Sequence, residues 1–396
     1  MKISKGRTRA IALVAATALG AAPLASPATA AASAASTRHR PAACPAGQLE
    51  TAALERAMAG LPDEAVATSA QVRVTTPAGC WTGATGVAKL GSQAPVPRNA
   101  RFRVGSVTKV FTATVLLKLA AEGRIDLGAP VQRYLPGLLP ADYPTVTVRQ
   151  LLDHTSGLPS PTLPDDIEWA LAHRYDRWTP EQLVRLGLRN ERAFDPGKKQ
   201  QYTNMGYIVA GMLIEKVTGH SYAREMRKQI FQPLGLHDTY VPGDDPTIRG
   251  PHAHGYQSVS RNGTSTLVDV TNWNQSITPA AGDLISTLAD LDTFAEALFG
   301  GRLLPAAQLA EMFTLPAVDD VDGGPALYSV GLTAFRLPTG ETLWVKSGSR
   351  YGYSAALAGT RDGAFRVAYS VTSTDAKGDG QNRVTGAIVE AVLGMR

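Results

Sequence analysis

The stretch RVGSVTKVFTATVLLKLAAEG, from Arg103 to Gly123, decides which fold to expect. After Gly105 it has the pattern of a helix that is apolar on nearly every side, and such helices are buried. Its first turn nevertheless carries Ser106 and Lys109, which lie at i and i+3 and therefore share one helical face. Either the serine caps the helix and the lysine reaches the surface, or the pair performs chemistry.

The chemical interpretation has a clear physical basis. An apolar setting disfavours the charged form of a lysine, so Lys109 can accept a proton. Ser106 is a weak nucleophile until a neighbouring base takes its proton. The unpaired N–H groups of a first helical turn favour developing negative charge. The S-x-x-K spacing is common by chance, so further segments must support it.

The segment QYTNMGY places Tyr202 and Asn204 together, just before another apolar helix. A tyrosine close to two lysines can be held as a phenolate and act as the general base. The amide of Asn204 can orient a substrate amide.

The segment VKSGSRYG predicts a strand that carries Lys346 and continues into Ser347, Gly348 and Ser349. The small residues let a substrate backbone approach the strand edge. The backbone N–H groups of Ser106 and Ser349 can then form an oxyanion hole. A nucleophile, a base, an amide clamp, a cation and two oxyanion donors are the set that acyl transfer requires.

Patterning along the chain predicts an α/β (α+β) protein. Strand-like runs lie near both ends, and those near the C-terminus are joined by short turns, which indicates an antiparallel sheet. We expect one domain over 47–396, with a sheet part at 47–105 and 286–396 and a mostly helical part at 106–285. The character of the chain changes after a Gly-, Asn- and Pro-rich region at about 242–281, and TPAAGDLIST is expected to be a loop over the site.

The N-terminus has the features of a secretory signal peptide over 1–31: a basic start, an apolar run and small residues at the cleavage site. Residues 32–46 are expected to be a disordered leader. The 396-residue chain has a net charge of +5, and removal of residues 1–31, which carry four basic residues and no acid, lowers it to about +1. This balance does not indicate nucleic-acid binding. Cys44 and Cys80 are expected to form a disulfide in an oxidising compartment, although two buried thiols would also fit.

The three motifs, S-x-x-K, Y-x-N and K-[ST]-G in this order, resemble those of the serine β-lactamase and penicillin-binding protein superfamily. The second motif begins with tyrosine, as in the class C branch of this superfamily. Within that branch the chain most resembles the secreted D-alanyl-D-alanine carboxypeptidases of actinomycetes. The resemblance covers roughly 48–394 and includes RFRVGSVTK, YLPGLLP, TVRQLLDHTSGL, VAGMLIEKVTGHS and AAQLAEM.

The resemblance implies a β-lactamase/transpeptidase-like fold and a role for each motif residue. Ser106 is acylated, Lys109 shares its proton, and Tyr202 acts as base and acid. Asn204 holds the acyl-side amide, and Lys346 helps to bind a substrate carboxylate. No metal or other cofactor is implied.

The implied activity is a D-alanyl-D-alanine carboxypeptidase that acts on cell-wall stem peptides and is acylated by penicillins. The expected partners are therefore small peptides or β-lactams, not nucleic acid or a membrane anchor, and the protein is expected to be a secreted monomer. A class C-like β-lactamase, an esterase or D-aminopeptidase, and a penicillin-binding sensor without turnover remain alternatives.

The chain also departs from its carboxypeptidase relatives. They carry His-Thr-Gly-Thr at the third motif, where this chain has Lys346-Ser347-Gly348-Ser349. The relatives also have a basic residue on the preceding strand that binds the terminal carboxylate. This chain has Thr333 at that position, and Arg336 or Arg350 could supply the missing positive charge.

Two histidine patterns are expected not to be catalytic. His154 and Ser156 in LLDHTSGL lack a third orienting group, and the resemblance implies a structural turn there. His252 and His254 have H-x-H spacing but no further metal ligands nearby in sequence.

Overall fold

The computed structural model describes residues 49–378 and 382–395. The predicted signal peptide, leader and Cys44 therefore lie outside the described residues. In the part of the chain that is described, no helix combines the length and the apolar character needed to cross a membrane.

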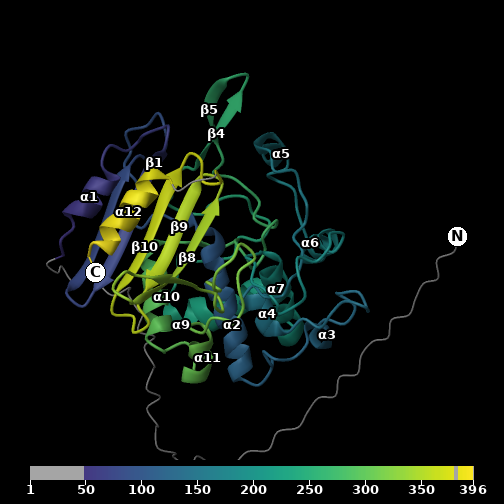
Figure 1. Ribbon diagram of the computed structural model, residues 1–396. Helices are drawn as coiled ribbons and strands as arrows, with labels where there is room; N and C mark the ends of the chain where they lie inside the picture. The colour runs from purple at the N-terminus through teal and green to yellow at the C-terminus, as the bar shows by residue number, and fades with distance from the viewer. Residues whose placement is uncertain (1–48, 379–381, 396) are drawn as a thin grey trace, which may run out of the picture. The chain divides into compact units, whose positions relative to one another are not determined.

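A six-stranded antiparallel sheet forms the centre, in the order β2-β1-β10-β9-β8-β7 (Figure 1). Strands from both ends of the chain build it, as the sequence predicts. Their bounds are β1 Ala67–Thr76, β2 Gly79–Gly86, β7 Thr333–Arg336, β8 Thr342–Arg350, β9 Tyr353–Gly359 and β10 Arg366–Ser373.

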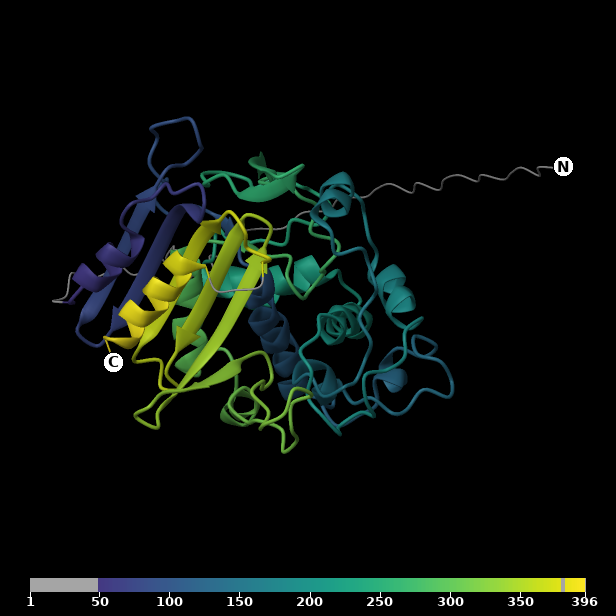
Figure 2. The ribbon, with the colours of Figure 1, turned by 45° about the horizontal axis from the view of Figure 1, so that its top comes forward.

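Helices cover both faces of the sheet. On one face α1 (Ala52–Met58) and α12 (Arg383–Leu393) pack against each other and enclose a core with β1 and β10. On the other face α10 (Leu288–Phe299) packs against β1, β9 and β10 (Figure 2). Because both faces are covered, β1 is buried over its first six residues without the alternation of a half-exposed strand.

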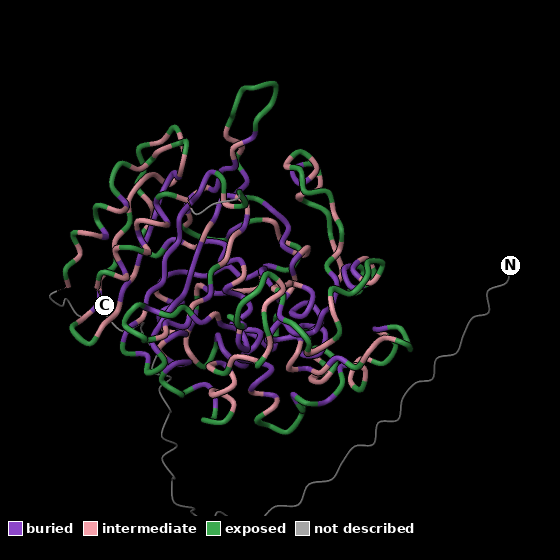
Figure 3. Tube along the Cα trace, viewed as in Figure 1, coloured by how far each residue is buried: buried purple, intermediate pink, exposed green. Residues whose placement is uncertain are grey.

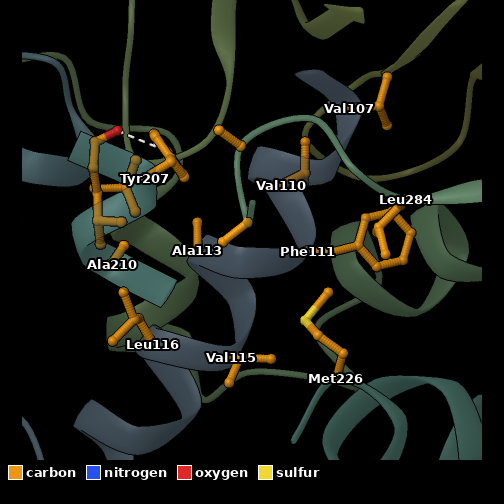
Figure 4. Packing of buried hydrophobic residues seen from close by; sticks show 14 of the residues in the cluster. Val107, Val110, Phe111, Ala113, Val115, Leu116, Tyr207, Ala210, Met226 and Leu284 are labelled. Carbon is orange, nitrogen blue, oxygen red and sulfur yellow. Dashed lines mark hydrogen bonds between the residues drawn. The ribbon is translucent and has the colours of Figure 1, made fainter. Parts of the chain in front are cut away.

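The second and larger core surrounds α2 (Thr108–Ala121), which is buried on nearly every side (Figure 4). In Figure 4, Val110, Phe111, Ala113 and Leu116 extend from α2 toward different neighbours. Phe111 stacks on Phe294 of α10 with ring centroids 3.7 Å apart. The all-round apolar pattern of this stretch therefore results from a helix that lies between the sheet side and the helical region.

The remaining elements form the helical region and its edges. Their bounds are β3 Phe102–Arg103, the 3-10 helix η1 Gly105–Val107, α3 Val131–Tyr134, α4 Val148–Leu152, α5 Ile167–Ala172, α6 Pro180–Gly187, α7 Met205–Thr218, α8 Tyr222–Met226, the π-helix η2 Arg227–Phe231, α9 Gln232–Leu234, β6 Ile285–Ser286 and α11 Ala306–Glu311.

Local sequence signals explain where several of these helices begin. At α6, Thr179 and Gln182 form a capping box and Pro180 occupies the first turn, as the sequence predicts. A second capping box, made by Thr147 and Gln150, starts α4. The latter helix leads directly into the turn that lies beside the site described below.

The Gly-, Asn- and Pro-rich region over about 242–281 holds two strands that the sequence did not indicate. This region contains a hairpin of β4 (Tyr256–Arg261) and β5 (Thr264–Asp269). Its turn residues Asn262 and Gly263 both have positive φ, of 51° and 77°, which is the conformation that a two-residue hairpin turn requires. The hairpin tip is exposed, as Figure 3 shows, so its sequence carries little of the hydrophobic alternation that marks a strand.

Candidate active site

The three predicted motifs meet at one cleft of about 560 Å³. The sheet side supplies β8, the helical side supplies η1 with α2, and the segment before α7 supplies Tyr202 and Asn204. The residues that line the cleft include Ser106, Tyr202, Asn204, Lys346, Ser347, Gly348 and Ser349. Lys109 lies beneath them and is completely buried.

Three oxygen atoms surround the Lys109 amine. Its Nζ lies 3.1 Å from Ser106 Oγ, 2.7 Å from Asn204 Oδ1 and 2.9 Å from the backbone oxygen of Ala281. The last two are carbonyl oxygens and can only accept. In a neutral amine they take both N–H groups, which leaves the nitrogen lone pair for the Ser106 hydroxyl.

Electrostatics favours this neutral amine. Burial lowers the pKa of Lys109 well below its ordinary value, and the nearby positive charges of Lys346, Lys377 and Arg350 lower it further. An uncharged lysine that faces a serine hydroxyl is a ready proton acceptor. The arrangement therefore activates Ser106 as a nucleophile.

The surroundings of Tyr202 favour a phenol over the phenolate that the sequence suggested for the resting site. Burial raises the pKa of Tyr202 above its ordinary value, and a hydrogen bond with Ser106 opposes that shift only in part. Lys109 Nζ and Lys346 Nζ lie 4.9 and 4.6 Å from the centre of the tyrosine ring. Because its surroundings disfavour the charged form of Lys109, this amine contributes less charge to stabilise a phenolate, and burial favours the phenol form of Tyr202.

Lys346 supplies the positive charge of the cleft. Its side chain is 5% exposed, and burial lowers its pKa to about 8. At neutral pH the ammonium form therefore still predominates. This charge is placed to stabilise negative charge that develops on Tyr202 or on a bound substrate.

The oxyanion rim depends on two glycines that allow backbones to approach closely. A Cβ at Gly348 would lie 2.5 Å from the Ser106 nitrogen and 2.1 Å from the Val104 oxygen. Gly105 has a φ of +53°, and a Cβ at this position would lie 2.6 Å from the Ser349 nitrogen. The structure therefore brings the Ser106 and Ser349 backbones together at one rim of the cleft.

The segment predicted as a loop over the site lies under Lys109. The Ala281 oxygen accepts from Lys109, and the neighbouring Ala280 oxygen accepts from Thr112 Oγ1 at 2.7 Å. Ala280 has a positive φ of 59°, which is unusual for a residue other than glycine. This turn is thus shaped to present two successive carbonyls to α2.

One wall of the cleft was only partly predicted from the sequence. Thr333 of β7, the position named above, lies on it together with Tyr328. The β10–α12 connection and the start of α12, which the sequence did not indicate, add Asp375, Ala376, Lys377, Asn382 and Thr385. Neither Arg336 nor Arg350 is among the lining residues, so the cation that accompanies Lys346 in the cleft is Lys377. Asp375, Ala376 and Lys377 follow β10 directly, and the antiparallel pairing of β10 with β9 brings them to the site.

The other sequence candidates lie outside the cleft lining. His252 and His254 stack with ring centres 5.6 Å apart, and His254 Nδ1 contacts Asp269 at 2.7 Å. The described residues contain no group of three or more His, Cys, Asp or Glu that could hold a metal. Cys80 is disulfide-bonded, and Cys44 is the other cysteine of the chain.

A comparison with family models matches residues 54–391 to the Beta-lactamase family. Among curated proteins, the chain is 29% identical over 285 residues to penicillin-binding protein 4* of Bacillus subtilis, a match that spans 69% of this chain and 60% of that protein. The chain thus spans about three fifths of that relative.

Solved structures give a fuller match. The chain is 36% identical to a D-stereospecific amidohydrolase from Streptomyces sp., with a TM-score of 0.74 over 87% of this chain and 98% of the other. For the D-amino acid amidase from Ochrobactrum anthropi SV3 in complex with D-phenylalanine, the identity is 27% and the TM-score 0.72, over 87% and 97%. Together with the site geometry, these matches show that the chain belongs to the β-lactamase family of serine hydrolases, whose fold it shares.

Proposed function

We propose that this protein is a secreted serine carboxypeptidase that removes a C-terminal D-alanine from D-alanyl-D-alanine peptides and is acylated by penicillins. The observation that carries the proposal is the charge of the cleft wall. Lys346 and Lys377 line the same cleft as Ser106, and Asp375 is the one carboxylate among its described lining residues. A substrate that ends in a free carboxylate complements such a wall.

Acylation begins with the buried pair beneath the cleft. Ser106 Oγ transfers its proton to the neutral Lys109 amine and forms a bond to the substrate carbonyl carbon. The carbonyl oxygen becomes an oxyanion and is held by the N–H groups of Ser106 and Ser349. Asn204, whose Oδ1 already accepts from Lys109, is placed to contact the acyl-side amide.

Expulsion of the leaving group uses Tyr202. The phenol donates its proton to the leaving nitrogen as the C–N bond breaks, and Lys109 returns a proton to the phenolate. Lys346, 4.6 Å from the ring centre, stabilises the transient phenolate. Water then attacks the acyl-Ser106 ester, and the same groups move the proton in the opposite direction.

A matched pair of substrates tests the proposal. Diacetyl-Lys-D-Ala-D-Ala should be hydrolysed with a kcat/KM about tenfold or more above that of its C-terminal amide, because only the free acid pairs with the cationic wall. Ser106→Ala should abolish both activities and also the mass adduct with benzylpenicillin. Equal rates on the acid and the amide, or no turnover of either, would contradict the proposal.

A second candidate function is the hydrolysis of D-amino-acid amides, which the similarity to the D-stereospecific amidohydrolase favours. Such substrates have a free amine and an uncharged leaving group. D-phenylalanine amide as substrate separates the two functions. Turnover of this amide without turnover of the dipeptide acid would select the amidase, and consumption of benzylpenicillin without a lasting adduct would select a β-lactamase.

A further inference from the structure

His154 lies in a tight turn that directly follows α4 and contacts, in space, the segment that carries Tyr202. Its side chain is buried, and its backbone has a φ of +64°, a left-handed conformation that is rare for residues other than glycine. Asp153 braces the turn, because its Oδ1 accepts from the Thr155 nitrogen at 3.1 Å and from Thr155 Oγ1 at 2.6 Å. A strained residue next to an active site suggests a role beyond connecting two elements.

The backbone and ring of His154 bind the two residues that flank Tyr202. Its carbonyl oxygen accepts from the Gln201 nitrogen at 3.0 Å. Its Nδ1 accepts from the Thr203 nitrogen at 3.3 Å. The left-handed turn and these two bonds thus occur together, and the carbonyl and the ring contact the same neighbouring segment.

The imidazole ring also contacts the tyrosine side chain itself. The ring centres of His154 and Tyr202 are 4.6 Å apart. Tyr207 and Tyr328 enclose the imidazole, at 5.5 and 5.2 Å. The Tyr202 ring is thus held between the imidazole on one side and the two lysine amines on others.

The imidazole is neutral in this setting. Burial lowers the pKa of His154 well below its ordinary value, and the charge of Lys346 lowers it further. A neutral ring that accepts at Nδ1 carries its hydrogen on Nε2. His154 therefore adds no charge beside Tyr202, and its contribution is the placement of the tyrosine.

We propose that His154 is a positioning residue that holds the Tyr202 hydroxyl against Ser106 through its bond to Thr203 and its ring contact with Tyr202. The proposal rests on the proton-transfer role of Tyr202 in the proposed function. It does not depend on which D-amino-acid substrate the enzyme takes.

Two variants separate the parts of this role. His154→Asn tolerates the left-handed backbone and keeps an acceptor, Oδ1, near the place of Nδ1, but it removes the ring. His154→Gly keeps the backbone conformation and removes both contacts. The probe is benzylpenicillin, whose ring nitrogen leaves when Ser106 is acylated and therefore needs the proton of Tyr202, and the readout is the rate of Ser106 labelling by intact mass.

We expect His154→Gly to slow labelling by about 100-fold, because displacement of a catalytic group by about 1 Å costs that much. His154→Asn should recover part of the loss. In a Tyr202→Phe background, neither substitution should cost more than about twofold, since residues that act as a unit are not additive. His252→Asn, outside the cleft lining, is the matched control and should label at the wild-type rate.

A loss that persists unchanged in the Tyr202→Phe background would overturn the proposal, as would labelling of His154→Gly at the wild-type rate. If the wild-type protein is not labelled, the crystal structure of His154→Gly decides instead. A Tyr202 hydroxyl that has moved away from Ser106 supports the positioning role, and an unmoved hydroxyl refutes it. Failure on D-alanyl-D-alanine peptides alone would overturn only the proposed function.

Discussion

The floor and the wall of the cleft differ in construction. The floor consists of Ser106, Lys109 and the turn that contains Ala281. Lys109 is buried, and its amine contacts three oxygen atoms, one hydroxyl and two carbonyls. The wall, formed by β8, β7 and the β10–α12 connection, is partly open to solvent, and Lys377 on it is exposed.

This difference separates reaction class from substrate choice. A buried, fully hydrogen-bonded floor cannot be altered without loss of the proton acceptor, so it determines that the chemistry is acyl transfer. An exposed wall tolerates substitution at little cost in stability, and its charges act on the substrate.

The largest expected effect concerns the floor. Lys109→Met should slow the acylation of Ser106 by benzylpenicillin by about 10²–10⁴-fold, because the proton acceptor is lost. It also leaves Asn204 Oδ1 and the Ala281 oxygen without their donor, so a lower melting temperature is expected. Intact mass against time and thermal unfolding measure the two effects. Acylation at the wild-type rate would mean that another group activates Ser106.

Tyr202→Phe should have the next largest effect. We expect a loss of about 10²–10³-fold in kcat, with a much smaller change in KM, because the phenol acts during proton transfer and not in initial binding. Steady-state kinetics on diacetyl-Lys-D-Ala-D-Ala provides the measurement. Tyr207→Phe is the matched control. Tyr207 is also a buried tyrosine, but it lies in α7 and its hydroxyl donates to the backbone oxygen of Leu152. A similar loss in both variants would argue for a general structural effect.

The pH profile of kcat/KM should have an acid limb set by Lys109 on the floor and an alkaline limb set by Lys346 on the wall. Activity should fall at low pH as the Lys109 amine gains a proton, since its pKa lies well below the ordinary value and only the neutral form accepts from Ser106. It should fall again above about pH 8, where Lys346 loses its proton. In Lys346→Arg the alkaline limb should move up by about 2 units or more, because a guanidinium stays charged. An alkaline limb that does not move would assign it to Lys377, the other lysine of the cleft, whose pKa is also lowered to about 8 by desolvation.

The smallest expected effect concerns the exposed part of the wall. Lys377→Met should raise KM for the dipeptide acid by about 3–10-fold and leave kcat for its C-terminal amide unchanged, because an exposed charge contributes about 1 kcal/mol to pairing. Lys228→Met, on η2 and outside the cleft lining, is the control and should change neither value. An equal rise in KM for acid and amide would show that Lys377 does not pair with the carboxylate.

Much of this architecture follows from local patterns. The antiparallel strands at both ends, the capping box at α6 and the all-round apolar character of α2 result from side-chain periodicity and capping chemistry, which act over a few residues. The three motif segments could be predicted to meet because they resemble those of a known family.

Other features could not be predicted because they arise between distant segments. The protonation of Tyr202 depends on burial, which no local pattern reports. Lys377 reaches the cleft only through strand pairing, and the bond from Thr203 to His154 joins segments 49 residues apart. The hairpin β4–β5 was missed because its exposed tip lacks hydrophobic alternation.

The sequence by itself therefore determined the kind of chemistry, since the residue types at Ser106, Lys109, Tyr202 and Lys346 limit the reactions that they can perform. Only the tertiary structure decided which of these groups is charged. It removes Lys109 and Tyr202 from water and leaves Lys346 as the cation of the cleft. The physical reason is that residue type sets which protons a group can exchange, whereas burial and neighbouring charges set the pKa at which it exchanges them.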